Sequence, residues 1–205
     1  MNRTMAWVSL GLSGLFGVLG IGLRTWLHAR RTGRSPIRGG AGMSGWIALG
    51  ALTLLFIAGP VAELAFGAPR LVDSDWLSAL GLVLSVVGLA AMVWSQSSMG
   101  NSLRIGVDPT ERTELVTAGP FRWVRNPIYT AMLIYVGGVA LLVPNAWSLA
   151  AFGLLALGVD LHVRLVEEPY LAATHGRAYA TYAARVGRFV PLAGRLSPLA
   201  KGSET

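Results

Sequence analysis

The chain has 205 residues, of which 53% are hydrophobic and only 13% are charged. Soluble domains carry roughly a quarter charged residues, so this composition excludes an ordinary soluble protein and predicts an integral membrane protein. The chain contains no cysteine, which excludes disulfides, thiolate nucleophiles and cysteine metal sites. The net charge of +7 is distributed between apolar runs, so we expect phospholipid headgroups as partners rather than nucleic acid.

Five long apolar runs predict five transmembrane helices. The runs extend over Ala6 to Leu23, Trp46 to Phe66, Trp76 to Trp94, Ile128 to Val143, and Trp147 to about Val166. Tryptophans bracket the third run, as side chains at membrane interfaces do. Pro144-Asn145 separates the last two runs by a tight turn, which predicts an antiparallel helical hairpin. The expected fold class is therefore all-α, an integral membrane bundle of about five transmembrane helices.

The first two runs contain residues that allow two interpretations. An arginine-rich segment follows the first run, so we expect a retained membrane helix rather than a signal peptide. Glycines recur in this run at three-residue steps, at Gly11, Gly14, Gly17 and Gly20. No strand precedes them, as a nucleotide-binding glycine loop requires, so they predict close helix packing in lipid. Near the end of the second run, Glu63 is expected to be an interfacial carboxylate, with a buried functional role as the alternative.

Two polar stretches flank the helical hairpin. The first, Ser95 to Asn126, contains two strand-capable pieces, Leu103 to Val107 and Glu114 to Thr117, on either side of a turn composition. A small β-hairpin and an irregular loop are equally compatible with this pattern. The second stretch, Glu167 to Pro191, alternates charged and aromatic residues and predicts one or two short interfacial helices.

Lysine and arginine residues alternate between sparse and dense connections. The N-terminal segment carries one, Arg24 to Arg38 five, the next connection one, Arg104 to Arg125 four, the following turn none, and the segment from Arg164 onward six. By the positive-inside rule, the N-terminus lies outside, and the long polar interval and the C-terminal segment share the cytoplasmic side. The expected organisation is a three-helix membrane part at 1–94, a membrane hairpin with cytoplasmic segments at 95–191, and a polar tail at 192–205.

The segment from Gly119 to Tyr129 is basic, aromatic and punctuated by prolines. Its two prolines, Pro120 and Pro127, favour a stiff connector that leads into a helix starting near Pro127. The helix N-terminus and the guanidinium groups of Arg122 and Arg125 are expected to converge on an anionic ligand. The alternative is that both arginines anchor the segment to lipid headgroups.

A second group of ionisable residues lies at the cytoplasmic end of the fifth run. At 100° per residue, Asp160, Arg164, Glu167 and Glu168 project from one helix face. They form either a polar site or a salt-bridge ladder from Asp160 through Arg164 to Glu168, although Pro169 disturbs the turn that such a ladder would stabilise. Arginines suit a carboxylate or phosphate, and glutamates suit an ammonium group or a ribose diol. The three histidines, His28, His162 and His175, are too scattered to predict a metal site, and we treat them as surface or interfacial residues.

Two sequence blocks carry a resemblance to a known family. The first block is Leu115-Val116-Thr117-Ala118-Gly119-Pro120-Phe121-Arg122-Trp123-Val124-Arg125-Asn126-Pro127-Ile128-Tyr129. Further along the chain come Glu167-Glu168-Pro169-Tyr170-Leu171, Gly176, Tyr179, Tyr182 and Arg188-Phe189-Val190-Pro191. In order and spacing, these blocks resemble the isoprenylcysteine carboxyl methyltransferase family and the related phospholipid methyltransferases. The resemblance covers roughly Met99 to Pro191.

The resemblance implies a membrane enzyme that binds S-adenosylmethionine on the cytoplasmic side and methylates a lipophilic small molecule or lipid-modified substrate reached from the bilayer. The cofactor-binding residues that it implies are Val116, Gly119, Pro120, Arg125, Asn126, Pro127, Tyr129, Glu167, Glu168 and Leu171. Arg164 matches a position for substrate or catalysis, and Glu168 is the expected base for an amine substrate. The family usually places histidine at position 126, and the asparagine here cannot titrate near neutral pH, so we expect it to position the cofactor.

Two other functions are compatible with parts of the pattern. NADPH-dependent membrane sterol or enone reductases look similar around Asn126-Pro127 and Tyr129, but they need basic residues for a 2′-phosphate and usually more helices. A non-catalytic membrane scaffold explains the helices and the charge but gives Glu167-Glu168-Pro169 no purpose. The compact size and the lack of a C-terminal retention signal favour a bacterial plasma membrane. The natural methyl acceptor and the oligomeric state are left open.

Overall fold

The computed structural model describes residues 3–23, 30, 43–99 and 115–197. The helices are α1 (Thr4–Gly17), α3 (Met43–Phe66), α4 (Asp75–Met99), α5 (Pro127–Leu142), α6 (Ala146–His162) and α7 (Glu168–Arg185). A π-helical turn, Val18–Leu23, extends α1, and a second one, Val163–Glu167, joins α6 to α7. Within the described ranges the only β-type pairing is an isolated parallel bridge between Val124 and Gly187. The predicted all-α fold class is therefore confirmed.

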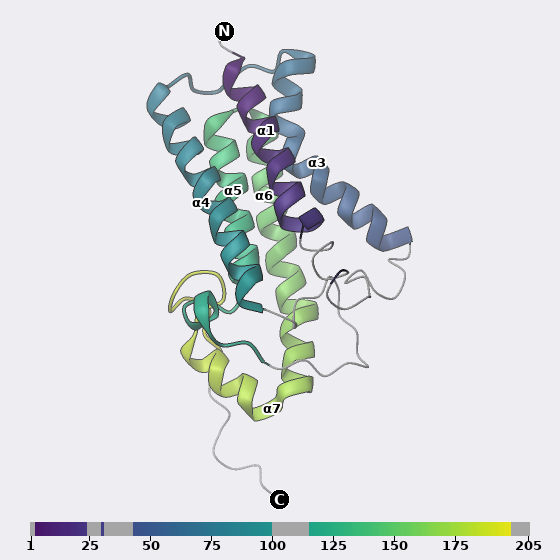
Figure 1. Ribbon diagram of the computed structural model, residues 1–205, viewed down its shortest axis with the longest axis vertical. Coiled ribbons are helices and arrows are strands. Elements are labelled where there is room, and N and C mark those ends of the chain that lie inside the picture. Colours follow the sequence, from purple (N-terminus) through teal and green to yellow (C-terminus); the bar gives the residue numbers. More distant parts are fainter. Residues whose placement is uncertain (1–2, 24–29, 31–42, 100–114, 198–205) are drawn as a thin grey trace, which may run out of the picture.

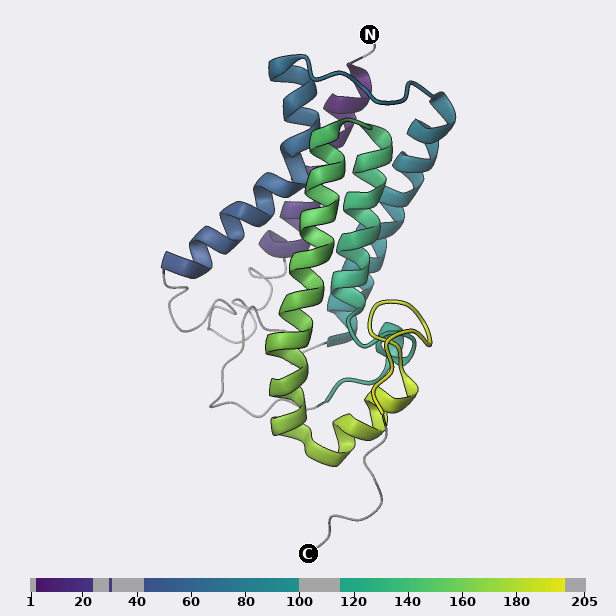
Figure 2. The same ribbon diagram turned by 180° about the vertical axis from the view of Figure 1, so that it is seen from behind.

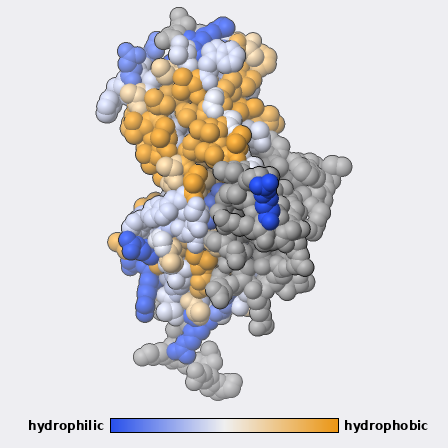
Figure 3. All heavy atoms as spheres, in the orientation of Figure 1, coloured by the Kyte–Doolittle hydropathy of each residue, from blue (hydrophilic) through white to orange (hydrophobic). Residues whose placement is uncertain are grey.

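Helices α1, α3, α4, α5 and α6 form an elongated bundle, and α7 lies beyond one end of it, opposite the N-terminus (Figures 1 and 2). Among the described residues, α4 and the continuous helical stretch Ala146–Arg185 are long and apolar enough to cross a membrane. Shorter apolar helices cover Thr4–Gly20, Thr53–Phe66 and Pro127–Leu142. Figure 3 shows hydrophobic residues gathered in a band across the bundle, with hydrophilic residues at the N-terminal end and over the opposite lobe. The protein is thus an integral membrane protein with a polar lobe built on one end.

The closest helix pair in the bundle is α4 with α5, and glycines allow this approach. A Cβ atom on Gly88 would lie 2.6 Å from the backbone nitrogen of Tyr135, and one on Gly138 would lie 2.5 Å from the backbone nitrogen of Ser85. Such short distances leave room only for a hydrogen atom, so small residues let the two backbones touch.

The predicted packing role of the glycines in the first run is wrong for three of the four within the described part of the chain. There, a Cβ atom at Gly11, Gly14 or Gly17 would meet nothing within 4 Å, whereas one at Gly20, in the π-helical extension, would lie 2.7 Å from the Cε of Met92. The regular glycine spacing in the first run therefore does not mark the close helix contact of this bundle. That contact lies between α4 and α5.

Helix α4 continues beyond the predicted end of the third run at Trp94 and reaches Met99. The serine hydroxyls in its last turns can hydrogen-bond to the backbone of the helix itself. Ser95 Oγ, for example, donates to the carbonyl of Ala91 at 2.7 Å. Gln96 Nε2 donates to the carbonyl of Gly20 at 2.7 Å, which ties α4 to the end of the α1 extension. The helix therefore continues through its polar residues after Trp94, because these side chains find hydrogen-bond partners.

The hairpin of α5 and α6 is confirmed, with Asn145 as the capping residue of α6. Asn145 Oδ1 accepts from the backbone nitrogen of Ser148 at 2.9 Å, and its Nδ2 donates to the carbonyl of Gly59 at 2.9 Å. One asparagine thus caps α6 and ties the hairpin turn to α3. The predicted β-hairpin of the polar interval falls on residues 100–114, outside the described residues, while Leu115 to Thr117 form irregular chain.

Glu63 is not an interfacial carboxylate as predicted, because its side chain is fully buried. Arg70 folds back from the loop after α3 and donates to both carboxylate oxygens, with distances of 3.0 Å from Nε and 2.9 Å from Nη2. A carboxylate held by a two-pronged guanidinium contact can be buried within protein near a helix end. The pair stabilises the end of the bundle opposite α7.

Candidate functional site

The first sequence block, described from residue 115, forms a compact connector that leads into α5. A 3₁₀ turn covers Gly119–Arg122, with Pro120 buried in its first turn, and α5 begins at Pro127, as predicted. Gly119 has a φ of +59°, and a Cβ atom there would lie 2.7 Å from Ser98 Oγ, so glycine is required by both backbone and space. This connector holds Arg125 and Asn126 at the end of the bundle.

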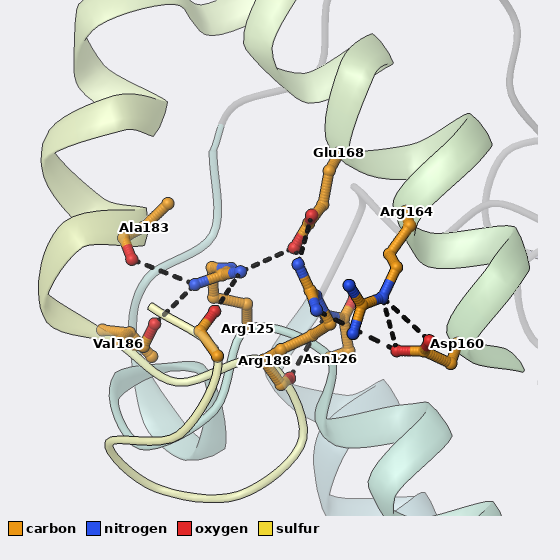
Figure 4. A network of polar contacts seen from close by, with 9 residues as sticks. Arg125, Asn126, Asp160, Arg164, Glu168, Ala183, Val186 and Arg188 are labelled. Carbon is orange, nitrogen blue, oxygen red and sulfur yellow. Dashed lines mark hydrogen bonds and ion pairs between the residues drawn. The ribbon is translucent and has the colours of Figure 1, made fainter. Parts of the chain in front are cut away.

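An ion cluster then joins this connector to α7 (Figure 4). Arg125 Nη2 donates to Glu168 Oε1 at 2.6 Å. Arg188, which follows α7, donates to both oxygens of the same carboxylate, at 2.8 Å from Nε and 2.9 Å from Nη2. We call Arg125, Glu168 and Arg188 the arginine lock. Their side chains are 1%, 11% and 10% exposed, so the lock is an internal structure.

The guanidinium of Arg125 makes further hydrogen bonds inside the protein. Its Nη1 donates to the carbonyls of Ala183 at 3.0 Å and Val186 at 2.6 Å, and its Nη2 donates to the carbonyl of Gly194 at 3.0 Å. Arg125 thus binds Glu168 and three backbone carbonyls from the end of α7 and the loop beyond it. The geometry gives this arginine a positioning role in the site.

Arg122 and Arg125 do not converge as predicted. Arg122 is exposed, and its guanidinium carbon lies 4.5 Å from the ring centroid of Trp123, while Arg125 is buried. The Arg122 guanidinium lies against an exposed tryptophan and is not a member of the arginine lock. The prediction of a stiff connector did not specify that the two side chains would have different surroundings, one exposed and one buried.

The chain beyond α7 is also held to the connector through its backbone. The nitrogens of Arg125 and Asn126 donate to the carbonyls of Gly187 at 2.8 Å and Arg188 at 3.2 Å. The side-chain Nδ2 of Asn126 donates to the Arg188 carbonyl as well, at 3.2 Å. Asn126 therefore positions the second block, a task that needs an amide donor and no titrating group.

Glu167 contacts a second set of residues, separate from the arginine lock. Tyr129 OH donates to Glu167 Oε1 at 2.6 Å, and His162 Nε2 lies 3.5 Å from the same oxygen. The His162 ring also meets the Tyr129 ring edge-on, with centroids 6.1 Å apart. Among the described residues, no hydrogen bond engages Glu167 Oε2, and the side chain is 27% exposed. This oxygen is free to accept from a ligand.

Adjacent glutamates serve different partners because the turn between α6 and α7 is π-helical. The segment Val163–Glu167 adds a residue relative to an α-helical turn, which rotates everything after it. Arg164 pairs with Asp160, Nε to Oδ2, at 2.8 Å, and its side chain is 54% exposed. The predicted ladder is therefore correct for its first step, but Glu168 turns to Arg125 and Arg188 instead of Arg164.

The electrostatics of the lock keep Glu168 ionised. Burial by itself raises the pKa of this carboxyl, but hydrogen bonds from Arg188 and Arg125 and their positive charges outweigh it, so the net pKa lies below the usual range. A carboxylate with a lowered pKa is a weak proton acceptor. Burial likewise raises the pKa of Tyr182, whose OH stays protonated and donates to the carbonyl of Phe121 at 2.6 Å.

Two further predicted site residues, Val116 and Leu171, are not members of either cluster. Val116 is half-buried in the irregular chain before the 3₁₀ turn, and Leu171 is half-buried near the start of α7. Sequence reasoning missed two members of the site, Arg188 and His162. Arg188 could have been found, because it opens the last segment of the second block, whereas His162 looks like an ordinary residue at a helix end until the π-helical turn brings it to Glu167.

Comparison with known proteins identifies the family. The phospholipid methyltransferase family model matches residues 76–178. Protein-S-isoprenylcysteine O-methyltransferase B of Arabidopsis thaliana is 31% identical over 133 residues, covering 64% of this chain and 67% of that protein. Methyltransferase A of the same plant is 30% identical over 127 residues, covering 60% of this chain and 64% of that protein. The chain therefore spans about two thirds of the length of these relatives.

A bacterial relative and a solved structure extend the comparison. The cobalt-zinc-cadmium resistance protein CzcN of Cupriavidus metallidurans is 32% identical over 149 residues, covering 71% of this chain and 62% of that protein. The structure of the eukaryotic intramembrane Ras methyltransferase ICMT, isoprenylcysteine carboxyl methyltransferase, shares the fold with a TM-score of 0.57. It is 18% identical and covers 93% of this chain and 77% of that chain. With its two blocks joined at one end of a membrane bundle and a family model matching half its length, this chain belongs to the phospholipid methyltransferase family.

Proposed function

We propose that the protein is a membrane methyltransferase that uses S-adenosylmethionine and acts on a lipophilic acceptor reached from the bilayer, with its cofactor pocket on the cytoplasmic side. Family membership supports the reaction class. The observation that carries the proposal is the pair of contacts between the two blocks, Arg125 with Glu168 and Tyr129 with Glu167, both at 2.6 Å. They bring residues that the resemblance assigns to the cofactor together at one end of the bundle.

The side chains present fit this cofactor. Glu167 offers a carboxylate oxygen that is free among the described residues and suits a ribose diol or an ammonium group. Arg164, half-exposed and oriented by Asp160, suits the carboxylate of an acceptor beside the cofactor. When bound, S-adenosylmethionine supplies a methyl group that is already activated for transfer. The protein's part is to position the reactants and limit water, effects worth roughly 7–11 kcal/mol when orientation is good.

The lowered pKa of Glu168 favours an acceptor that needs no base. A carboxylate acceptor attacks with its own lone pair and releases no proton, whereas an amine would have to lose one to a neighbouring group. The names of the plant relatives specify O-methyl transfer to S-isoprenylcysteine. We therefore propose a carboxylate on a lipophilic or lipid-modified molecule, held by Arg164, as the acceptor. A catalytic role for Glu168 stays a prediction, and the geometry supports Glu168 as a positioning residue.

The proposal is tested by ligand binding to the detergent-purified protein. We expect S-adenosylmethionine and S-adenosylhomocysteine to bind in calorimetry and to raise the unfolding temperature, and NADPH to do neither. The Glu167→Gln variant should keep its unfolding temperature without ligand and bind S-adenosylhomocysteine at least about tenfold more weakly, a loss of roughly 1.4 kcal/mol. Binding of NADPH alone would identify a reductase, and a folded protein that binds none of the three would be a scaffold.

A further inference from the structure

The segment that follows α7, residues 186–194, turns back toward the bundle, and we call it the return loop. Thr130, in the first turn of α5, donates its hydroxyl to the carbonyl of Phe189 at 3.0 Å. The Phe189 side chain packs against the main hydrophobic core of the bundle. Figures 1 and 2 show this loop beside the lower end of α4 and α5 in both views. The loop therefore lies at the level where the apolar bundle begins.

The tip of the return loop presents apolar side chains outward. Val190 is 60% exposed and Leu192 is 69% exposed. Leu192 has a φ of +69°, a left-handed conformation that is unfavourable for leucine. The backbone around it is fixed, because Arg188 N donates to Ala193 O at 2.7 Å and Ala193 N donates to Val190 O at 3.1 Å. The protein thus holds two apolar side chains out of its own core in a defined geometry.

Two tryptophans and an arginine form a cluster near the end of α4 that faces the polar lobe. Trp94 and Trp123 are 47% and 45% exposed, and their rings meet edge-on with centroids 5.6 Å apart. Arg122 lies over the Trp123 ring at 4.5 Å. Trp94 belongs to a helix long and apolar enough to span the membrane, so this group lies near the end of that span. Tryptophan and arginine in this position are typical of a membrane interface.

The return loop joins this level directly, since Val124, the residue after Trp123, forms the parallel bridge with Gly187. We propose that the return loop is a membrane contact in which Val190 and Leu192 insert into the edge of the hydrocarbon, while Trp94, Trp123 and Arg122 lie at the headgroup level. A bilayer suits the combination of exposed apolar residues, interfacial tryptophans and a positive charge better than an aqueous protein partner does. This inference concerns lipid contact and does not depend on methyl transfer.

The proposed contact would also hold the arginine lock in place. The return loop supplies the carbonyls of Val186 and Gly194 to Arg125 and carries Arg188 itself. Lipid around Val190 and Leu192 would therefore fix the segment that completes the lock. The bilayer is part of the site's support under this proposal.

The experiment uses the absence of cysteine from the chain, which allows a single label at a chosen position. Leu192→Cys and Val190→Cys variants are labelled with bimane and reconstituted into phosphatidylcholine vesicles that contain lipids with a nitroxide near the top of the acyl chain. Ala178→Cys, exposed on α7, is the matched control. We expect nitroxide quenching at positions 190 and 192 to exceed that at 178 by roughly twofold or more, because nitroxides quench only nearby fluorophores and those tips lie at acyl-chain depth.

Two results would overturn the proposal. Quenching at 190 and 192 no stronger than at 178, with the labels at 190 and 192 open to aqueous iodide, would place the return loop in water. Labels at 190 and 192 that are shielded from aqueous iodide without being quenched by the lipid would show that protein covers the tip. Position 190 lacks the positive φ of position 192, so it reports independently if replacement of Leu192 disturbs the loop.

Discussion

At Glu168, one carboxylate accepts hydrogen bonds from two guanidinium groups that belong to different segments of the chain. Arg125 comes from the connector before α5, and Arg188 from the loop after α7. Charges as buried as these are tolerated only when they are paired, so each member depends on the others. The neighbouring Glu167 is more exposed and holds one tyrosine, which leaves it available for a ligand.

We expect Glu168→Gln to destabilise the protein by about 3 kcal/mol, because the amide leaves the buried Arg125 without a countercharge and Arg188 with only the longer contact to Asp160, at 3.9 Å. The matched Glu167→Gln variant should cost less than about 1 kcal/mol, since its side chain is part-exposed. Denaturant unfolding in detergent, followed by circular dichroism, measures both. Equal losses in the two variants would contradict the division of roles between the glutamates.

The lowered pKa of Glu168 also predicts how stability depends on pH. A carboxyl whose pKa is lower in the folded protein contributes stability above its unfolded pKa, roughly 4.3, and loses that contribution as pH falls through the lower folded value. We therefore expect the unfolding temperature of the native protein to drop below about pH 4.3 more steeply than that of Glu168→Gln. Parallel curves for the two proteins between neutral and acidic pH would show that the lock does not depend on this charge.

At the scale of the helices, the contact of α4 with α5 depends on glycines, whereas a Cβ atom on the α1 glycines would meet none of the residues that the structure describes. Gly88→Ala places a methyl group 2.6 Å from the Tyr135 nitrogen and should cost about 1–3 kcal/mol. The methyl group of Gly11→Ala meets nothing within 4 Å among the described residues, so this change should stabilise α1 by roughly 0.5–1 kcal/mol. Unfolding temperatures of the two variants in detergent test this contrast. An unchanged unfolding temperature for Gly88→Ala would mean that α4 and α5 can move apart without loss of stability.

The π-helical turn between α6 and α7 sets the direction of α7. Deleting Val166 from this turn should restore an α-helical turn and rotate the following chain by about 100°, which removes Glu168 from Arg125. We expect trypsin to cleave α7 at Arg177 and Arg185 faster in this variant. Leu165→Ala, at a position 71% exposed, is the control and should leave the cleavage rate unchanged. An unchanged rate in the deletion variant would show that the lock tolerates the rotation.

The helices themselves followed from hydropathy, because long apolar runs in a membrane protein have few alternatives to helix. The start of α5 at Pro127 and the hairpin at Asn145 also followed, since proline and a capping asparagine act locally. The π-helical turn did not, because no local signal marks one added residue in a helix. Without it, helical spacing places Glu168 on the same face as Arg164, and a ladder between them is one of two interpretations. The arginine lock is a long-range arrangement that sequence spacing alone could not give.

For the whole molecule, the N-terminal end and the polar lobe lie at opposite ends of the bundle (Figure 1). The predicted orientation places the loop between α3 and α4 outside and α7 in the cytoplasm. We expect a membrane-impermeant maleimide to label Asp73→Cys, exposed in that loop, in intact cells, and to label Ala178→Cys only after the membrane is opened. The reverse pattern would invert the orientation and put the proposed cofactor pocket outside.

The arginine lock also has a consequence for biosynthesis. Arg125 lies in the connector before α5, yet its hydrogen-bond partners include Ala183, Val186 and Gly194, and its countercharge is Glu168. While the ribosome is still translating α7, the bundle helices can already be inserted, but the guanidinium of Arg125 has none of its final carbonyl partners. The site is therefore completed only after residue 194 has emerged, and a chain interrupted before that point would be inserted in the membrane without a finished site.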